Sequence, residues 1–159
     1  MTIELDPAKI LEVERLVAAP IGLVFEMFSD ARHLDAWWGP DGFRNETHEM
    51  DFSVGGLWRY TMHGPDGKDW PNWIRYQDIS PPNRIAYQHG GEMGEPAHFE
   101  GVITLRDERE LTRVILTLIF ATREARDATF KFGAVEGGKQ TLARLDAHVT
   151  ALHALARGT

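Results

Sequence analysis

The segment from Gly133 to about Leu155 constrains the fold most strongly, because its pattern predicts one long amphipathic helix. Apolar residues recur in this segment at separations of three, four or seven, as they do along the buried stripe of a helix. A helix with such a stripe needs a surface to cover, and the rest of the chain must supply it. The apolar positions are Val135, Leu142, Leu145, Val149, Leu152 and Ala156.

Two glycines, Gly137 and Gly138, fall in the first turns of this predicted helix. Each costs about 1 kcal/mol relative to alanine inside a helix, so their presence needs a reason. Close packing against a strand is the commoner reason, and we favour it. The alternative is that the start of the helix forms one lip of a ligand entrance, together with the segment Phe130-Lys131-Phe132.

The chain ahead of this helix is predicted to form strands, turns and two short helices. Alternation of apolar and polar residues predicts a first strand over Ile10–Val17. Helical spacing then predicts short helices over 20–29 and from residue 31 to the stop signal Gly39-Pro40. Alternation returns in six further segments, at about 44–52, 57–63, 73–79, 84–89, 99–105 and 113–120.

Short turns join neighbouring strands, so these strands are expected to pair in antiparallel fashion. The fixed hand of strand twist curls a sheet of this size. The sequence therefore predicts a single α+β domain over residues 1–159, in which a curved antiparallel sheet of about seven strands wraps around the long C-terminal helix, with two short helices after the first strand. Any cavity would lie between the sheet and that helix.

Composition excludes several classes of function. The formal net charge is −7 and Lys and Arg form no cluster, which argues against nucleic acid or an anionic membrane surface as a partner. The chain has no cysteine, so it holds neither a disulfide nor a thiolate metal site. No apolar run approaches the length of a membrane span, and the first residues lack the pattern of a signal peptide. We therefore expect a cytoplasmic protein without membrane insertion.

The histidines do not suggest a metal site. His48 belongs by parity with Met50 in the set expected to be buried, whereas His63 falls in the outward set of the next strand, so the two should point apart. His148 and His153 are five residues apart on the long helix and face different sides. We expect no metal and no cofactor.

Two residues are candidates for acid–base chemistry, although motifs such as Gly-x-Ser-x-Gly and His-Glu-x-x-His are absent. Glu46 shares parity with His48, and lies either at the edge of the sheet, which we favour, or buried with a raised pKa. His89 shares parity with Ile85 and Tyr87, and is a general base, a hydrogen-bond partner for a ligand or, most commonly, a satisfied core histidine. No catalytic residue is assigned.

Aromatic residues on the predicted inner face suggest a site for a hydrophobic small molecule. We predict that a lipid, an aromatic or a polyketide-like compound lies between sheet and helix, with tyrosine hydroxyls and His89 orienting its polar ends. The mixed parity of Trp73, Ile74 and Ile79 suggests a β-bulge in the strand of Tyr76. The predicted ligand contacts are Trp37, Trp38, Met50, Trp58, Tyr60, Tyr76, Tyr87, His89, Phe99, Phe120 and Phe132.

Several motifs taken together resemble those of one family. They are Ala36-Trp37-Trp38-Gly39-Pro40, Met50-Asp51-Phe52-Ser53-Val54-Gly55-Gly56-Leu57-Trp58, Met62-His63-Gly64-Pro65-Asp66-Gly67, Pro81-Pro82-Asn83-Arg84-Ile85 and Phe132-Gly133-Ala134-Val135-Glu136-Gly137-Gly138-Lys139-Gln140-Thr141-Leu142. From about Ile10 to Leu155 the chain closely resembles the activator-of-heat-shock-protein-90-ATPase-like proteins of the START and birch-pollen-allergen-like (SRPBCC) superfamily. This resemblance implies the helix-grip fold, with a deep and largely hydrophobic cavity between the sheet and the long helix.

The resemblance leaves three functions open. Binding of a hydrophobic small molecule comes first, because relatives on this fold bind lipids, plant hormones or polyketides. The second is an enzyme of the cyclase or hydrolase kind, with His89 or Glu46 as base and a tyrosine as acid. The third is a module that contacts a chaperone and takes part in the stress response. A homodimer is also left open.

Overall fold

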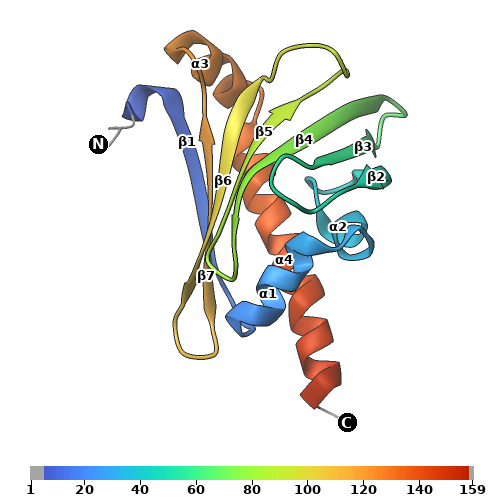
Figure 1. Cartoon of the computed structure of the whole chain (residues 1–159), viewed down its shortest axis with the longest axis vertical. Coiled ribbons are helices and arrows are strands. Elements are labelled where there is room, and N and C mark those ends of the chain that lie inside the picture. The colour runs from blue at the N-terminus through green and yellow to red at the C-terminus, as the bar shows by residue number, and fades with distance from the viewer. Residues whose placement is uncertain (1–5, 158–159) are drawn as a thin grey trace.

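The computed structural model describes residues 6–157, which form a curved antiparallel sheet wrapped around a long helix (Figure 1). Within these residues the sheet has seven strands in the order β1-β7-β6-β5-β4-β3-β2, and each neighbouring pair is antiparallel. The strands are β1 (Ile10–Val17), β2 (Arg44–Met50), β3 (Leu57–His63), β4 (Asp69–Ser80), β5 (Arg84–Gly90), β6 (Phe99–Asp107) and β7 (Thr112–Ile119).

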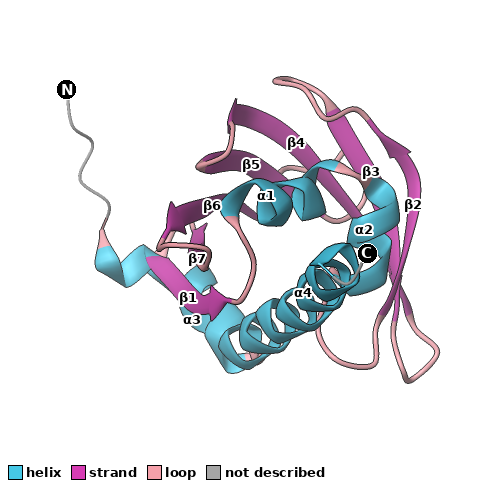
Figure 2. Ribbon diagram, turned by 90° about the horizontal axis from the view of Figure 1, so that it is seen from below, coloured by secondary structure: helices cyan, strands magenta, loops and turns pink. Residues whose placement is uncertain are grey.

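The long helix α4 (Ala134–Arg157) lies along the concave side of this sheet (Figure 2). Two short helices, α1 (Ile21–Ser29) and α2 (Ala31–Trp37), connect β1 with β2 and pack against α4. A short 3-10 helix (Pro7–Lys9) precedes β1. This arrangement confirms the predicted α+β class and the helix-grip order of elements.

The middle of the predicted apolar stripe of α4 is buried, whereas Val135 and Leu152 are partly buried and Ala156 is exposed. Leu142, Leu145 and Val149 expose 2% or less of their surface. At the rim of the same contact, the guanidinium Nε of Arg15 on β1 donates a hydrogen bond to Oδ2 of Asp146 at 2.8 Å. Apolar burial therefore holds α4 against the sheet, and this ion pair ties the helix to the edge strand.

The two glycines of α4 differ in what surrounds them. A Cβ at Gly138 would lie 3.0 Å from Cγ2 of Val13 on β1, which is closer than an ordinary contact between carbon atoms. At Gly137 the nearest atom to such a Cβ is Cβ of Pro40, at 3.8 Å. Gly138 thus allows α4 to approach β1 closely, which agrees with the packing interpretation.

A helix that the sequence pattern did not predict, α3 (Arg123–Lys131), joins β7 to α4. None of its residues is buried, so it has no apolar stripe for hydrophobic periodicity to reveal. The local signal lies at its start, where Oγ1 of Thr122 accepts a hydrogen bond from the backbone N–H of Ala125 at 3.1 Å.

The prediction of which β2 residues face inward was wrong. The register of β2 against β3 shifts between Thr47 and Glu49, which leaves His48 in a β-bulge. Asn45, before the bulge, is buried with 4% exposure, and His48 is exposed. Met50, beyond the bulge, packs against the core as expected. One additional residue in a strand reverses the facing of every residue on one side of it.

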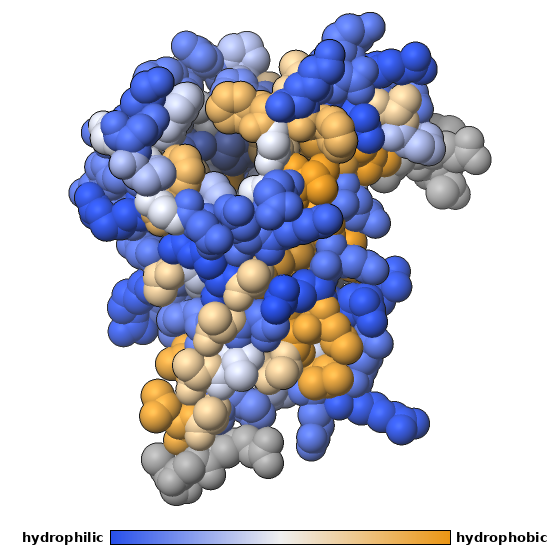
Figure 3. Space-filling model, turned by 180° about the vertical axis from the view of Figure 1, so that it is seen from behind, coloured by the Kyte–Doolittle hydropathy of each residue, from blue (hydrophilic) through white to orange (hydrophobic). Residues whose placement is uncertain are grey.

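No helix within residues 6–157 combines the length and the apolar character needed to cross a bilayer. The face of the molecule that is hidden in Figure 1 is mostly hydrophilic, and its hydrophobic side chains lie in separate groups (Figure 3).

Candidate functional site

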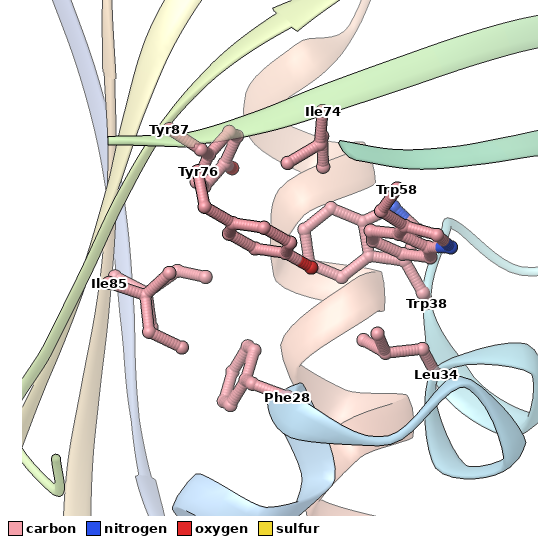
Figure 4. A pocket seen from close by; sticks show the side chains of 9 residues that line it. Phe28, Leu34, Trp38, Trp58, Ile74, Tyr76, Ile85 and Tyr87 are labelled. Carbon is pink, nitrogen blue, oxygen red and sulfur yellow. The ribbon is translucent and has the colours of Figure 1, made fainter. Parts of the chain in front are cut away.

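A small cavity lies between the sheet and the short helices α1 and α2. Its volume, taken as the space open to the centre of a water molecule, is about 10 Å³, roughly enough for one water. Figure 4 shows its lining, with Phe28 and Leu34 on the side of the short helices and the tyrosines on the side of the sheet. The lining residues are Phe28, Leu34, Trp38, Trp58, Ile74, Tyr76, Ile85, Tyr87 and Ile103.

Four of the predicted ligand contacts line this cavity: Trp38, Trp58, Tyr76 and Tyr87. A fifth, Tyr60, supports the lining. Trp58 and Tyr60 occupy alternate positions of β3, so they project to the same side, and their rings stack with centroids 4.1 Å apart. The indole N–H of Trp38 donates a hydrogen bond to the hydroxyl oxygen of Tyr60 at 3.0 Å. These contacts join the end of α2 to the inner face of the sheet.

The adjacent residues Trp37 and Trp38 have different surroundings. Trp37 is fully buried, its ring meets that of Phe28 edge-on at 5.0 Å, and its N–H donates to the backbone carbonyl of Met27 at 3.2 Å. Trp37 therefore belongs to the core behind the cavity. Trp38 follows the last residue of α2, is partly exposed and contacts the ring of Trp58 at 5.5 Å.

Tyr76 on β4 and Tyr87 on β5 are opposite each other in the sheet and both face inward. The register shifts between Tyr76 and Asp78, which confirms the bulge predicted in this strand. Gly101 on β6 lies under Tyr87, because a Cβ at this position would overlap the tyrosine ring. Burial raises the pKa of both tyrosine hydroxyls, so both stay protonated at neutral pH. The hydroxyl of Tyr76 points into the cavity (Figure 4).

Three further predicted contacts, His89, Phe99 and Phe120, form a second aromatic group beside the cavity lining. The ring of His89 stacks on Phe99 with centroids 4.6 Å apart, and Phe99 lies 5.4 Å from Phe120. Burial, with a smaller contribution from His98, lowers the pKa of His89 to about 3, so the imidazole is neutral at pH 7. Its Nδ1 is buried and has no hydrogen-bond partner among the described residues.

The remaining predicted contacts, Met50 and Phe132, lie outside the cavity lining, but only Phe132 is remote from it, since Met50 is opposite Trp58 in the sheet. Met50 is the last residue of β2 and packs against the edge of the core. Phe132 follows the last residue of α3 and is 85% exposed, so it does not contact the cavity.

Five residues of the lining were not predicted from the sequence. Three of them follow the same strand alternation as the tyrosines, so parity could have found them, although an aliphatic side chain signals core more readily than a site. The other two come from α1 and α2, whose placement over the sheet is a tertiary property. They are Ile74, Ile85 and Ile103 on the strands, and Phe28 and Leu34 on the helices.

Glu46, the other candidate base, lies on the opposite face of the sheet. Its Oε1 is 2.8 Å from Nε2 of His63, whose Nδ1 is 2.6 Å from Oδ1 of Asp69. The hydrogen bond with His63 lowers the pKa of Glu46, so the interpretation as a buried carboxylate with a raised pKa is wrong. His48 also faces outward, 2.7 Å from Oγ1 of Thr61, so the expectation that His48 and His63 point apart is wrong too. The cause is the bulge at His48.

No metal centre is built by these side chains. Among residues 6–157, no group of three or more His, Cys, Asp or Glu side chains is placed to hold a metal ion. The aromatic residues predicted as ligand contacts offer aromatic surfaces, neutral hydroxyls and, in His89, one neutral imidazole.

Known proteins share this fold. The family model described as Activator of Hsp90 ATPase homolog 1-like protein matches residues 18–150. A solved structure from Nitrosomonas europaea matches with a TM-score of 0.86 at 21% identity over 94% of this chain and 99% of the other. One from Mycobacterium smegmatis has a TM-score of 0.84 at 25% identity over 96% and 99%. One from Arthrobacter aurescens has 0.85 at 24% identity over 94% and 91%. No curated protein sequence matches the chain.

Proposed function

Because the chain belongs to the Activator of Hsp90 ATPase homolog 1-like family, we propose that it binds a small, largely apolar molecule between the sheet and the short helices α1 and α2. The AHSA1/SRPBCC-like fold commonly binds hydrophobic ligands. We further propose that the ligand binds in the cavity lined by Trp38, Trp58, Tyr76 and Tyr87.

The observation that carries the proposal is the character of this lining. Its walls are apolar or aromatic and contain no charged side chain. The indole N–H groups of Trp38 and Trp58 already donate to the hydroxyls of Tyr60 and Thr47, so the hydroxyls of Tyr76 and Tyr87 are the side-chain groups that the lining offers to a ligand. Sites for small molecules typically combine mostly apolar walls with a few placed hydrogen-bonding groups. A lining that served only as core would need no hydroxyls, since each buried hydroxyl must find a partner.

Entry of a ligand requires side chains to move. Ligand sites usually offer roughly 300 Å³ or more, whereas this cavity holds about 10 Å³. The lining residue best placed to move is Trp38, because it lies beyond the end of α2 and is partly exposed, while Trp58 exposes 1%.

We propose binding rather than catalysis because both candidate bases lie away from the cavity. His89 is outside the lining, and Glu46 faces the opposite side of the sheet and pairs with His63. A cytoplasmic location, a homodimer and contact with a chaperone stay predictions from the sequence.

The proposal is tested with two matched glycine substitutions. Gly101 lies under Tyr87 on the inner face of the sheet, and Gly90 lies under the ring of Trp73 on the outer face. Alanine at either position displaces an aromatic ring, but only Gly101→Ala pushes a ring into the cavity. The assay is fluorescence titration with N-phenyl-1-naphthylamine, an uncharged probe that brightens in apolar surroundings.

We expect the wild type to bind the probe, Gly101→Ala to bind at least tenfold more weakly and Gly90→Ala to bind within twofold of the wild type. Thermal unfolding of each variant checks that it is folded. Equal loss of binding in the two variants, or none in Gly101→Ala, would place the probe elsewhere and refute the proposed site.

A further inference from the structure

We propose that the indole ring of Trp38 occupies the ligand position in the unliganded protein, and that the ligand resembles this ring: an uncharged, flat, two-ring aromatic molecule with one hydrogen-bond donor. The inference rests on the proposed function, because it names the class of ligand for the same cavity. Two observations support the inference: the contacts that the ring of Trp38 makes, and the absence of charged side chains from the cavity lining.

The contacts of Trp38 are those of a bound aromatic molecule. Its ring is held edge-on between those of Trp37, at 5.6 Å, and Trp58, at 5.5 Å, both of which are buried. Edge-on contacts of this kind hold flat aromatic groups in a defined orientation. Trp38 itself is partly exposed, so the ring lies between the cavity and solvent.

The hydrogen bond of Trp38 identifies the polar group that a ligand needs. The indole N–H donates to the hydroxyl oxygen of Tyr60, which exposes only 1% of its surface. If the ring of Trp38 swings away, this buried oxygen loses its donor, and a buried polar atom without a partner is unfavourable. A ligand that donates one hydrogen bond at the same place restores the lost interaction, whereas a pure hydrocarbon does not.

The electrostatics of the cavity exclude a charged ligand. Its lining contains no acidic or basic side chain, and burial raises the pKa of Tyr76 and Tyr87 so that both stay neutral. Arg144, which bonds to the backbone directly after Trp38, is not part of the lining, and its Nη1 donates to the carbonyls of Gly39 at 2.8 Å and Pro40 at 2.9 Å. A carboxylate in the cavity would therefore lack a partner of opposite charge.

The hydrogen bonds from Arg144 also determine which part of Trp38 can move when its ring leaves the cavity. They anchor the backbone directly after Trp38 to α4, and the N–H of Trp38 is bonded to the carbonyl of Leu34 at 2.8 Å. With its backbone fixed on both sides, the indole moves by rotation about its own side-chain bonds. Displacement of one side chain is consistent with a site that is closed when empty.

The first test compares three probes of one shape on the wild-type protein at pH 7. Naphthalene has no polar group, 2-naphthol adds one neutral donor and 2-naphthoate adds a charge. Each competes with N-phenyl-1-naphthylamine, and its Kd follows from the displacement. We expect 2-naphthol to bind at least fivefold more tightly than naphthalene and at least fiftyfold more tightly than 2-naphthoate.

The second test uses Trp38→Phe and Tyr60→Phe, with Trp73→Phe as the matched control. Trp73 likewise donates its indole N–H, to the carbonyl of Glu92 at 3.2 Å, but it lies on the outer face of the sheet. Trp38→Phe removes the hydrogen bond that competes with the ligand, so 2-naphthol should bind severalfold more tightly than it does to the wild type or to Trp73→Phe. Tyr60→Phe should bind naphthalene and 2-naphthol equally.

The outcomes separate the inference from the proposed function. If 2-naphthoate displaces the fluorescent probe as well as 2-naphthol does, or if Trp38→Phe binds no more tightly than Trp73→Phe, the inference is overturned while binding in the cavity stands. If the wild type binds the fluorescent probe and Gly101→Ala does not, but none of the three naphthalene compounds displaces the probe from the wild type, the ligand class is likewise wrong. If the fluorescent probe itself is not bound, both the proposed function and the inference fail.

Discussion

Replacing Gly138 by alanine tests whether the close approach of α4 to β1 explains a glycine in the second turn of a long helix. Alanine is about 1 kcal/mol more favourable than glycine in a helix interior when its methyl group has room. At Gly138 it lacks room, because the new Cβ would lie 3.0 Å from Cγ2 and 3.5 Å from Cγ1 of Val13. Carbon atoms prefer a separation of roughly 3.5–4.0 Å, so Val13 must give way by about half an ångström.

The expected loss follows from the surroundings of Val13. It is buried, and as a β-branched residue it has few alternative rotamers. Overpacking of this kind costs about 1–3 kcal/mol, against the gain of about 1 kcal/mol in helix propensity. We therefore expect Gly138→Ala to be destabilised by about 0–2 kcal/mol. Gly137→Ala is the control, because its Cβ meets only Pro40 at 3.8 Å, and it should be stabilised by up to about 1 kcal/mol.

Urea unfolding followed by far-UV circular dichroism gives the free energy of unfolding of both variants. A difference of 1 kcal/mol corresponds to about 2–4 °C in Tm for a protein of this size, so thermal unfolding provides a second measurement. The Val13→Ala background isolates the cause, because there Gly138→Ala should become stabilising. If Gly138→Ala is as stable as Gly137→Ala in the wild-type background, the packing explanation is refuted.

Two further predictions concern histidines whose pKa shifts have opposite signs. The folded-state pKa of His89 is lowered to about 3, so below about pH 6.5 the unfolded chain binds more protons than the folded protein, and the free energy of unfolding decreases as the pH is lowered. His89→Phe, which keeps the stacking on Phe99, should remove a loss of up to about 2 kcal/mol between pH 8 and pH 5. An unchanged pH dependence of stability in urea unfolding would contradict this. The hydrogen bonds that His63 donates to the carboxylates of Glu46 and Asp69 raise its pKa. Its contribution to stability is therefore present below pH 6.5 and is lost as pH rises through the raised pKa. His63→Gln should lower Tm at pH 6 but not at pH 9, and equal Tm changes at both would show that the pairing does not stabilise the fold.

The fold could be predicted because its signals are local and periodic. The stripe through Leu142, Leu145 and Val149 depends only on spacing along one helix, and the alternation in strands such as Ile10–Val17 depends only on neighbouring residues. Where a single residue breaks the period, the prediction failed. The bulge at His48 reverses which side chains of the first part of β2 face the core, and no residue type in that strand signals a bulge.

The site was less predictable than the fold because its shape is set by contacts between distant elements. Residue type and strand alternation together identified Trp58 and Tyr87, because both are large aromatic residues at inward-facing positions. It could not show that Phe28 and Leu34 complete the cavity, because the placement of α1 and α2 over the sheet is not written in their own periodicity. Nor could it exclude Phe132, whose exposure follows from the polar helix before it.

A cavity of about 10 Å³ also limits how tightly any ligand can bind. The lining side chains already contact one another, so each contact that a ligand makes replaces one that the closed protein makes with itself. The apparent Kd is therefore the intrinsic Kd divided by the fraction of molecules in which Trp38 has left the cavity. This competition predicts a correlation across lining variants. Changes that weaken the closed arrangement without altering the ligand contacts, such as Trp38→Phe, should lower stability and strengthen binding together. Changes that only remove a ligand contact should weaken binding and leave stability less affected. If both kinds of variant lost affinity in proportion to lost stability, the lining would be acting as core alone.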